Sequence, residues 1–125
     1  MDFAAGAALS MQQSPHTKFA LDAMAAFPYR QLIGSLTYLM VATRPDLAFS
    51  FSKLSKFNNS PGRAHWETAC KVLGYLRQTG DVGLLYTREA TLQVQGFCDA
   101  AFACHIDDHR SQGGYVFMMD CAVIS

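Results

Sequence analysis

Residues 29–40 read YRQLIGSLTYLM, and this stretch decides the character of the N-terminal part of the chain. Its large aliphatic side chains recur at intervals of three and four residues, at Leu32, Ile33, Leu36, Leu39 and Met40. On an α-helix this spacing places them in a single stripe along one face. The stretch therefore predicts an amphipathic helix that packs its apolar face against other elements.

Two proline-containing turns follow this helix. Residues 43–46 read TRPD, and Ser60 is followed by Pro61. A serine or threonine cap with proline in the first helical turn is typical of a helix start. We therefore expect Thr43 and Ser60 to cap two further helices. The apolar positions of the first are Leu47, Phe51, Leu54 and Phe57, and those of the second are Trp66, Cys70, Leu73 and Leu76.

The pattern changes after Gly80, where the second of these helices should end. Residues 92–96 read LQVQG, and this alternation predicts a half-buried strand that ends near Asp99. Residues 115–119 predict a second strand, and residues 121–125 begin a third that stops, as in a truncated chain. Three helices, each with one apolar face, can pack as a small cluster. The expected fold is α+β, with a loose leader over 1–17, helices over 18–80 and strands over 81–125.

Composition narrows the class of protein. Of the 125 residues, 50% are hydrophobic and 16% are charged, which suits a compact domain rather than a disordered chain. The formal net charge is zero, so no general attraction to nucleic acid or to an anionic membrane is expected. The cysteines form no C-x-x-C pair, and the apolar stretch 32–42 is too short to cross a bilayer. We expect an intracellular protein, cytoplasmic or nuclear, that does not enter a membrane.

Several short blocks follow one another between residue 29 and residue 125. They read YRQLIGSLTYL (29–39), TRPDLA (43–48), SPGRAHW (60–66), LGYLRQT (73–79), GLLY (83–86), GFCDAAFA (96–103), DHRS (108–111) and GYVF (114–117). In their order and spacing they resemble copia-type LTR retrotransposon Gag-Pol polyproteins. The resemblance is to the junction between the C-terminal part of reverse transcriptase and the N-terminal part of ribonuclease H.

This resemblance implies what each part of the chain descends from. The helices would follow the polymerase palm, and the strands would be the first antiparallel strands of an incomplete ribonuclease H-like fold. The parent enzyme would bind an RNA–DNA hybrid or a primer–template. The polymerase's Tyr-x-Asp-Asp turn would lie upstream. Asp107 and Asp108 are not that turn, because His105 stands in place of the aromatic residue, and we interpret them as a solvated acidic turn.

Asp99 is the residue to which the resemblance gives a chemical role. Ribonuclease H cleaves RNA with two divalent ions, and magnesium is held by several carboxylates from separate elements. Asp99 would be the first of these, a catalytic residue and magnesium ligand. Taken alone, an aspartate at a strand end is more often a turn residue that hydrogen-bonds to backbone. The remaining ligands would follow residue 125, so we expect a vestigial site, no bound cofactor and no activity of the isolated chain.

The sequence departs from the family pattern close to Asp99. The departures are Ala101 for an acidic residue, Phe102 for tryptophan, Gln112 for threonine, Gly113 for serine, and His109-Arg110 for paired arginines. They are consistent with a decaying copy.

Other sites are less well supported by the residues. A zinc site would draw on Cys98, Cys104, His105 and His109, but the adjacent pair 104–105 would point to opposite faces if extended. A cysteine nucleophile lacks an oxyanion-hole loop. The basic residues are expected on solvated helix faces, although some could contact phosphates in a full enzyme. They are Arg44, Lys53, Lys56, Arg63, Lys71 and Arg77.

Two further hypotheses stay open. The chain could be a small helical interaction module retained by a host, presenting Phe49, Phe51 and Phe57 to a partner. Alternatively, an incomplete sheet with open edges would favour aggregation or degradation, so that the chain is not made stably.

Overall fold

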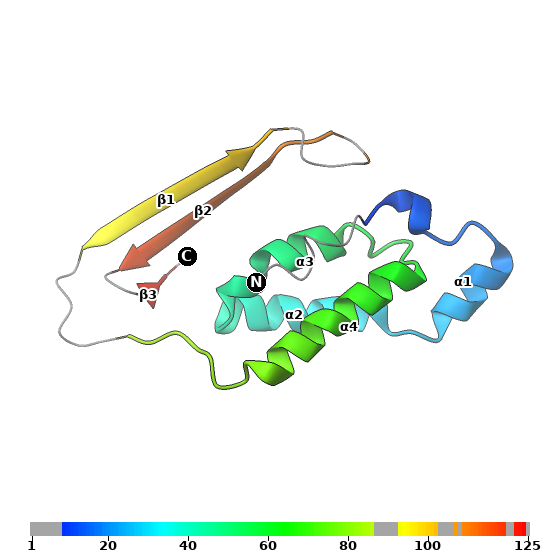
Figure 1. Cartoon of the computed structure of the whole chain (residues 1–125), viewed down its shortest axis with the longest axis horizontal. Coiled ribbons are helices and arrows are strands. Elements are labelled where there is room, and N and C mark those ends of the chain that lie inside the picture. The colour runs from blue at the N-terminus through cyan, green and yellow to red at the C-terminus, as the bar shows by residue number, and fades with distance from the viewer. Residues whose placement is uncertain (1–8, 87–92, 103–106, 108, 120–121, 125) are drawn as a thin grey trace. The chain divides into compact units, whose positions relative to one another are not determined.

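The computed structural model describes residues 9–86, 93–102, 107, 109–119 and 122–124. The chain forms two compact units, Met1–Val82 and Gly83–Ser125. The first is helical and the second contains the strands, which Figure 1 draws from yellow to red. The expected α+β composition is confirmed.

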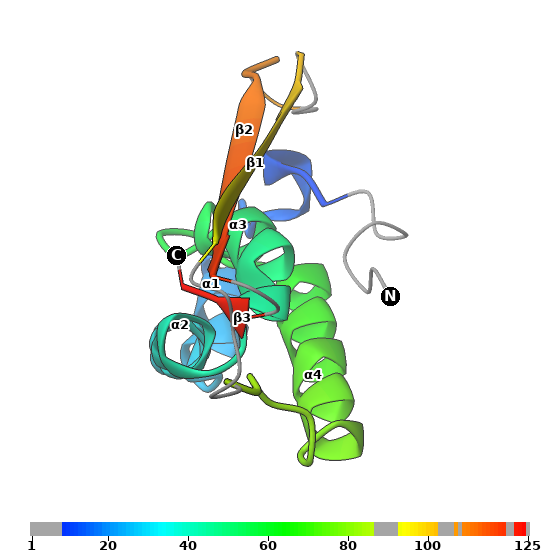
Figure 2. The ribbon, with the colours of Figure 1, turned by 90° about the vertical axis from the view of Figure 1, so that its left-hand side faces the viewer.

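The helical unit contains four α-helices and two short 3-10 helices among the described residues. They are η1 (Met11–Gln13), α1 (Lys18–Ala25), α2 (Tyr29–Ala42), η2 (Pro45–Leu47), α3 (Ala48–Ser55) and α4 (Arg63–Gln78). Helix α1, which the periodicity does not predict, begins where the Thr17 hydroxyl oxygen accepts a hydrogen bond from Ala20 N–H at 3.2 Å. Figure 2 looks along α2, with α3 and α4 beside it.

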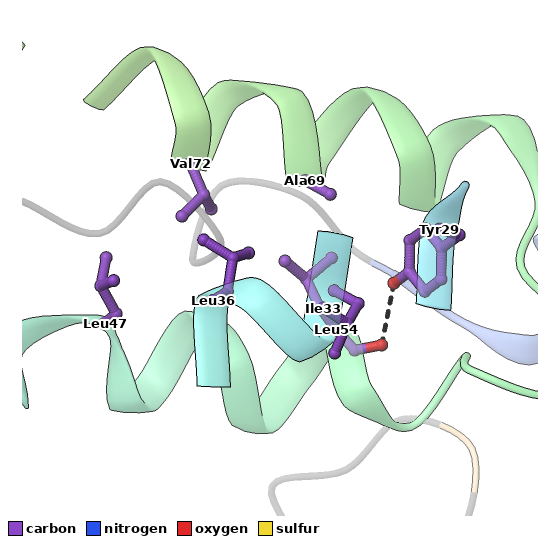
Figure 3. Packing of buried hydrophobic residues seen from close by; sticks show 7 residues of the cluster. All are labelled: Tyr29, Ile33, Leu36, Leu47, Leu54, Ala69 and Val72. Atoms are coloured by element: carbon purple, nitrogen blue, oxygen red, sulfur yellow. Dashed lines mark hydrogen bonds between the residues drawn. The ribbon is translucent and has the colours of Figure 1, made fainter. Parts of the chain in front are cut away.

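Side chains of α2, η2, α3 and α4 meet in one core. Val72 and Ala69 of α4 face Leu36 and Ile33 of α2 in Figure 3. The Tyr29 hydroxyl donates a hydrogen bond of 2.8 Å to the carbonyl oxygen of Leu54, so that its polar atom is satisfied inside the core. Burying a large aliphatic side chain stabilises the folded state by about 1.5–3 kcal/mol. The core residues are Tyr29, Ile33, Leu36, Leu47, Leu54, Ala69 and Val72.

The buried face of α4 differs from the predicted stripe by about one residue. His65, Thr68, Ala69 and Val72 are buried, whereas Leu73 is 42% exposed. Trp66, Cys70 and Leu76 are only partly buried. The prediction followed the largest apolar side chains of α4, whereas the buried face carries the smaller Thr68, Ala69 and Val72 together with His65.

Both predicted caps were wrong in position. Thr43 is the C-cap of α2, and Arg44 precedes η2 with Pro45 in its first turn. Helix α4 begins at Arg63 rather than at Pro61, with Gly62 as its N-cap. In the first turn, His65 Nδ1 accepts a hydrogen bond of 2.8 Å from the Gly62 N–H, and so satisfies the backbone donor of the N-cap residue itself.

The strand unit is a three-stranded antiparallel sheet in the order β1-β2-β3. Strand β1 (Val94–Ala101) pairs along its whole length with β2 (Gln112–Met119), from Val94 opposite Met119 to Ala101 opposite Gln112. The short β3 (Ala122–Val123) pairs only with Met118 and Met119. The predicted antiparallel strands are confirmed.

The prediction that the first strand is half-buried was wrong, because every residue of β1 is exposed. Apolar side chains lie on both faces of the β1–β2 hairpin. Phe97 and Val116 share one face, while Tyr115 and Phe117 share the other, with ring centroids 5.8 Å apart. Alternation along the strand therefore does not mark one buried and one solvated face.

Candidate functional site

Asp99 lies near the C-terminal end of β1, opposite Gly114 of β2. Its Oδ1 accepts a hydrogen bond of 2.8 Å from the N–H of Ala100. Gly114 brings no side chain beside it, and a Cβ at that position would meet no other atom within 4 Å. Asp99 is thus an exposed carboxylate with no side chain opposite it on β2.

The described residues around Asp99 do not fit a magnesium pair. No group of three His, Cys, Asp or Glu side chains that could hold a metal ion is found in the described ranges. One carboxylate, with one oxygen bonded to its own strand, supplies too few hard ligands for two ions. Asp99 therefore has the geometry of a strand-end hydrogen-bond acceptor, and the metal role implied for it stays a prediction.

The remaining candidates near the strands are only partly described. Cys98 is exposed on β1, on the opposite face from Asp99. His109 has a positive φ of 50° in the connection between β1 and β2. Cys104, His105 and Asp108, which the zinc site and the acidic pair would need, lie outside the described residues.

Arg44 is buried and holds together two of the sequence blocks that are far apart in the chain. Its guanidinium donates two hydrogen bonds to Asp46, from Nε to Oδ1 at 3.0 Å and from Nη2 to Oδ2 at 2.8 Å. It also donates to the carbonyl oxygen and to the hydroxyl oxygen of Thr79, both at 2.8 Å. The Tyr75 hydroxyl donates to Asp46 Oδ2 at 2.8 Å. We call these four residues the Arg44 clamp.

The Arg44 clamp is a structural element rather than a phosphate-binding site. Hydrogen bonds from Arg44 hold the pKa of Asp46 below its ordinary value, and the same pairing raises the pKa of Arg44. With 6% of its side chain exposed, Arg44 presents almost no surface to a ligand. Bidentate pairing fixes the geometry as well as adding stability. The expectation that Arg44 lies on a solvated helix face was wrong, because these contacts bury its side chain.

His65 forms a second buried polar site, which sequence reasoning missed. Its ring stacks on Phe57 with centroids 3.8 Å apart. Nδ1 accepts from Gly62 N–H, while Nε2 lies 3.2 Å from the carbonyl oxygen of Ser10. Since a carbonyl can only accept, Nε2 carries the hydrogen in this arrangement. His65 therefore joins the start of α4 to residue 10, inside the segment expected to be a leader, and no local sequence signal marks this contact.

The three phenylalanines of the proposed interaction face do not share one exposed surface. Phe57 is 3% exposed beneath His65, while Phe49 is 41% exposed. The Lys53 ammonium lies 4.6 Å from the centre of the Phe49 ring, a cation–π contact within α3. Phe57 is a core residue, so the proposed face is wrong as a set.

A pocket of about 300 Å³ lies between α1, the start of α2 and the loop before α4. Leu21 and Met24 form part of its apolar wall, and Arg30 donates from Nε to the Asn58 carbonyl oxygen at 2.8 Å beside it. The described lining contains no carboxylate, histidine or cysteine. It offers space for an apolar group and no acid–base chemistry.

Within the described residues, no helix has the length and apolar character needed to span a membrane.

Comparison with known proteins gives several relatives. Secreted RxLR effector protein 161 of Plasmopara viticola is 40% identical over 98 residues, which cover 78% of this chain and 69% of that protein. The retrovirus-related Pol polyprotein from transposon TNT 1-94 of Nicotiana tabacum is 38% identical over 117 residues, or 94% of this chain. The Pol polyprotein from transposon RE2 of Arabidopsis thaliana is 39% identical over 88 residues.

The fraction of each relative's length that this chain spans differs widely. This chain spans 9% of the TNT 1-94 polyprotein and 6% of the RE2 polyprotein. No protein-family profile matches it, and no solved structure matches it.

Proposed function

We propose that this chain is the piece of a retrotransposon Pol polyprotein in which helices following the polymerase palm join the start of ribonuclease H, because it is 38% identical to one such polyprotein over 94% of its own length. One observation carries this proposal. The match to the TNT 1-94 polyprotein covers 94% of this chain, and therefore includes both the helical unit and the strand unit. Both units would then descend from one polyprotein.

The apolar faces of the β1–β2 hairpin and the position of Asp99 support this assignment. An antiparallel hairpin with apolar side chains on both faces is what the interior of a larger sheet requires, because such a sheet is covered on both sides. Asp99 lies on the first long strand, at the end where the resemblance assigns a metal ligand.

On its own the chain would not cleave RNA. In the complete enzymes two magnesium ions activate water and stabilise the leaving oxygen. Here Asp99 would be one ligand by descent, and the others would come from outside this chain. The RNA–DNA hybrid or primer–template would be bound by the whole polyprotein, with exposed Lys71 and Arg77 of α4 as candidate phosphate contacts.

A cleavage assay tests the proposed inactivity. The purified chain is incubated with a labelled RNA–DNA hybrid and magnesium, beside the Asp99→Asn variant. We expect no magnesium-dependent cleavage above the variant. Turnover by the chain that Asp99→Asn abolishes would overturn the proposal.

A chimera tests the proposed descent of Asp99. This chain replaces the segment that it matches in the TNT 1-94 polyprotein, and hybrid cleavage is measured. We expect cleavage that Asp99→Asn abolishes and that Asp107→Asn leaves within about twofold. If the chimera cleaves equally well with and without Asp99, the proposed metal-ligand role is wrong.

A second candidate is a small interaction module, favoured by the relative from Plasmopara viticola, a short protein of which this chain covers 69%. In this function the helical unit would act without the rest of a polyprotein. Melting of the full chain tests it, because a module requires a cooperative transition of the helical unit. A gradual, non-cooperative loss of helical signal would exclude it.

A further inference from the structure

The pocket between α1, the start of α2 and the loop before α4 lies entirely within the helical unit. Its apolar wall includes Leu21 and Met24 of α1, together with Phe27 from the connection to α2. Its volume of about 300 Å³ is at the lower end of the range for small-molecule sites, which is about 300–1,000 Å³. A space of this size suits one large apolar side chain rather than an extended cofactor such as a dinucleotide.

Arg30 is the one charged residue among the described residues that line this pocket. Two hydrogen bonds orient its guanidinium, from Nε to the Asn58 carbonyl oxygen at 2.8 Å and from Nη2 to Asn59 Oδ1 at 3.4 Å. A guanidinium has five N–H donors, so N–H groups of Nη1 and Nη2 remain for another acceptor. The side chain is exposed, and the ion pairs found among the described residues do not include it. Arg30 therefore presents an oriented positive charge beside an apolar space.

We propose that this pocket binds the C-terminal residue of a peptide, with a large apolar side chain in the pocket and the terminal carboxylate on Arg30. A carboxylate and a guanidinium can pair through two parallel hydrogen bonds, which fix the orientation of the carboxylate as well as attracting it. A C-terminal residue carries its carboxylate and its side chain on the same Cα, so both groups can reach a site of this size. This inference does not depend on the proposed function.

The charges of the lining distinguish a peptide from other apolar ligands. A free amino acid would also bring an ammonium group, and the described lining has no carboxylate to pair with it. An apolar amine would be repelled by Arg30. In a peptide the α-nitrogen is instead an uncharged amide, whose N–H can donate to a side-chain oxygen of Gln31 or Ser60 in the same lining.

Three small probes that share a benzyl group test the proposal, with the full chain in an NMR titration. They are N-acetylphenylalanine, its primary amide and 3-phenylpropanoate. We expect N-acetylphenylalanine to shift the backbone amide signals of Met24, Phe27 and Arg30. Its dissociation constant should be at least about tenfold lower than that of the primary amide, because only the acid pairs with the guanidinium. 3-Phenylpropanoate keeps the carboxylate but lacks the acetamido group, and should bind at least about threefold more weakly than N-acetylphenylalanine.

Arg30→Gln tests the role of the charge. The matched control is Arg63→Gln, because Arg63 is exposed, does not line the pocket and pairs with Glu67 at 3.0 Å. Arg30→Gln should bind the acid and the primary amide equally, whereas Arg63→Gln should keep the preference for the acid of at least about tenfold. An unchanged preference in Arg30→Gln would contradict the proposed contact.

A second pair of variants leaves Arg30 and its hydrogen bonds in place. Leu21 lines the pocket with 50% of its side chain exposed, so polar substitutions are tolerated there. Leu21→Asp places a carboxylate in the wall, and Leu21→Asn has the same shape without the charge. Relative to Leu21→Asn, Leu21→Asp should weaken binding of the acid at least about fivefold and leave that of the primary amide within about twofold.

Two results with the natural sequence would overturn the proposal. The first is the absence of any shift of pocket signals at the highest soluble concentration of N-acetylphenylalanine, and the second is equal affinity for the acid and its primary amide. If 3-phenylpropanoate binds as tightly as N-acetylphenylalanine, the peptide amide is not recognised and a peptide C-terminus is not the occupant.

Discussion

The helical unit buries many of its large apolar side chains, whereas the described part of the strand unit leaves most of its own exposed. In residues 9–82 the side chains of α2, α3 and α4 converge on a shared core, and Leu36 and Leu54 are almost completely enclosed. In the described part of residues 83–125, Ala122 is the only buried hydrophobic residue, while Phe97 and Tyr115 are more than half exposed. The two units are joined in one chain, yet only the first encloses its large apolar side chains.

This difference shows that apolar content does not by itself make a unit self-sufficient. Each helix has one apolar stripe, and three stripes can cover one another. The strand unit is a small sheet in which β3 pairs with two residues of β2, and the apolar side chains on both faces of β1 and β2 stay largely exposed. In the described residues, the strand unit therefore leaves exposed the kind of apolar surface that the helical unit buries.

The single tryptophan of the chain allows unfolding of the helical unit to be followed on its own. Trp66 lies in α4, and its ring centroid is 5.1 Å from that of Phe27. Its fluorescence therefore reports unfolding of the helical unit, and the strand unit contributes no tryptophan signal. The predictions below use this signal in urea titrations.

The largest effect is expected from truncating the same residue type in each unit. Leu36→Ala removes a side chain that is 1% exposed and should lower the free energy of unfolding by about 2–5 kcal/mol. Leu85→Ala removes one that is 75% exposed and should change it by less than about 0.5 kcal/mol. Similar losses in both variants would mean that the strand unit shares the stability of the helical core.

The next largest effect is expected at Gly62, where the start of α4 lies close to the backbone of Gln13. A Cβ at Gly62 would lie 1.9 Å from the backbone oxygen of Gln13, so Gly62→Ala must displace either α4 or residues 10–13. We expect a loss of about 1–3 kcal/mol. Gly74→Ala is the matched control, because no atom lies within 4 Å of a Cβ there, and alanine should stabilise the helix by about 0.5–1 kcal/mol. If both variants are neutral, residues 10–13 do not contribute to the stability of the helical unit.

A smaller effect is expected from the buried phenol. Burial raises the pKa of Tyr29, so the hydroxyl stays protonated and donates to Leu54 O. Tyr29→Phe should cost about 1 kcal/mol, because the Leu54 oxygen still accepts from Phe57 N–H at 3.1 Å. Tyr38→Phe, at a side chain 74% exposed, should leave the urea midpoint unchanged. Equal midpoints for the two variants would argue against the hydrogen bond.

The smallest effect depends on pH. Because the folded state lowers the pKa of Asp46, its contribution to stability is present above the unfolded pKa of about 3.9 and is lost as the pH falls through the folded value. Asp46→Asn should destabilise the chain by less than about 1 kcal/mol at pH 7, since the carboxylate is 37% exposed. The difference between the natural sequence and the variant should shrink as the pH falls below 4. A constant difference from pH 7 to pH 2 would contradict this assignment.

The sequence predicted the parts of the fold that periodicity controls. The start of α2 at Tyr29, the apolar positions Leu47 and Leu54, and the presence of strands near residues 94–99 and 115–119 were predicted from spacing alone. Contacts between distant residues were not predictable, because no local pattern signals that His65 reaches Ser10 across 55 positions. The α4 stripe was misplaced for the same reason, since the identity of the packing partner decides which face is buried.

The candidate site was predictable only as a position. The resemblance located Asp99 near a strand end, where the structure has it, but the ribonuclease H-like fold and the metal role stay predictions. Arg44 shows that residue type alone does not predict exposure. A basic side chain that was expected on a solvated helix face instead donates hydrogen bonds to Asp46 and Thr79 inside the helical unit.

Helix α4 is fixed at both of its ends. His65 in its first turn bonds to Gly62 and Ser10, while Tyr75 and Thr79 at its other end bond within the Arg44 clamp. A single inserted or deleted residue between these anchors would rotate one end by about 100° relative to the other, and two whole added turns would lengthen the helix by about 11 Å. Among divergent copies that still fold, alignment gaps should therefore fall before residue 62 or after residue 79, so the length of this segment identifies intact members even where its letters have changed.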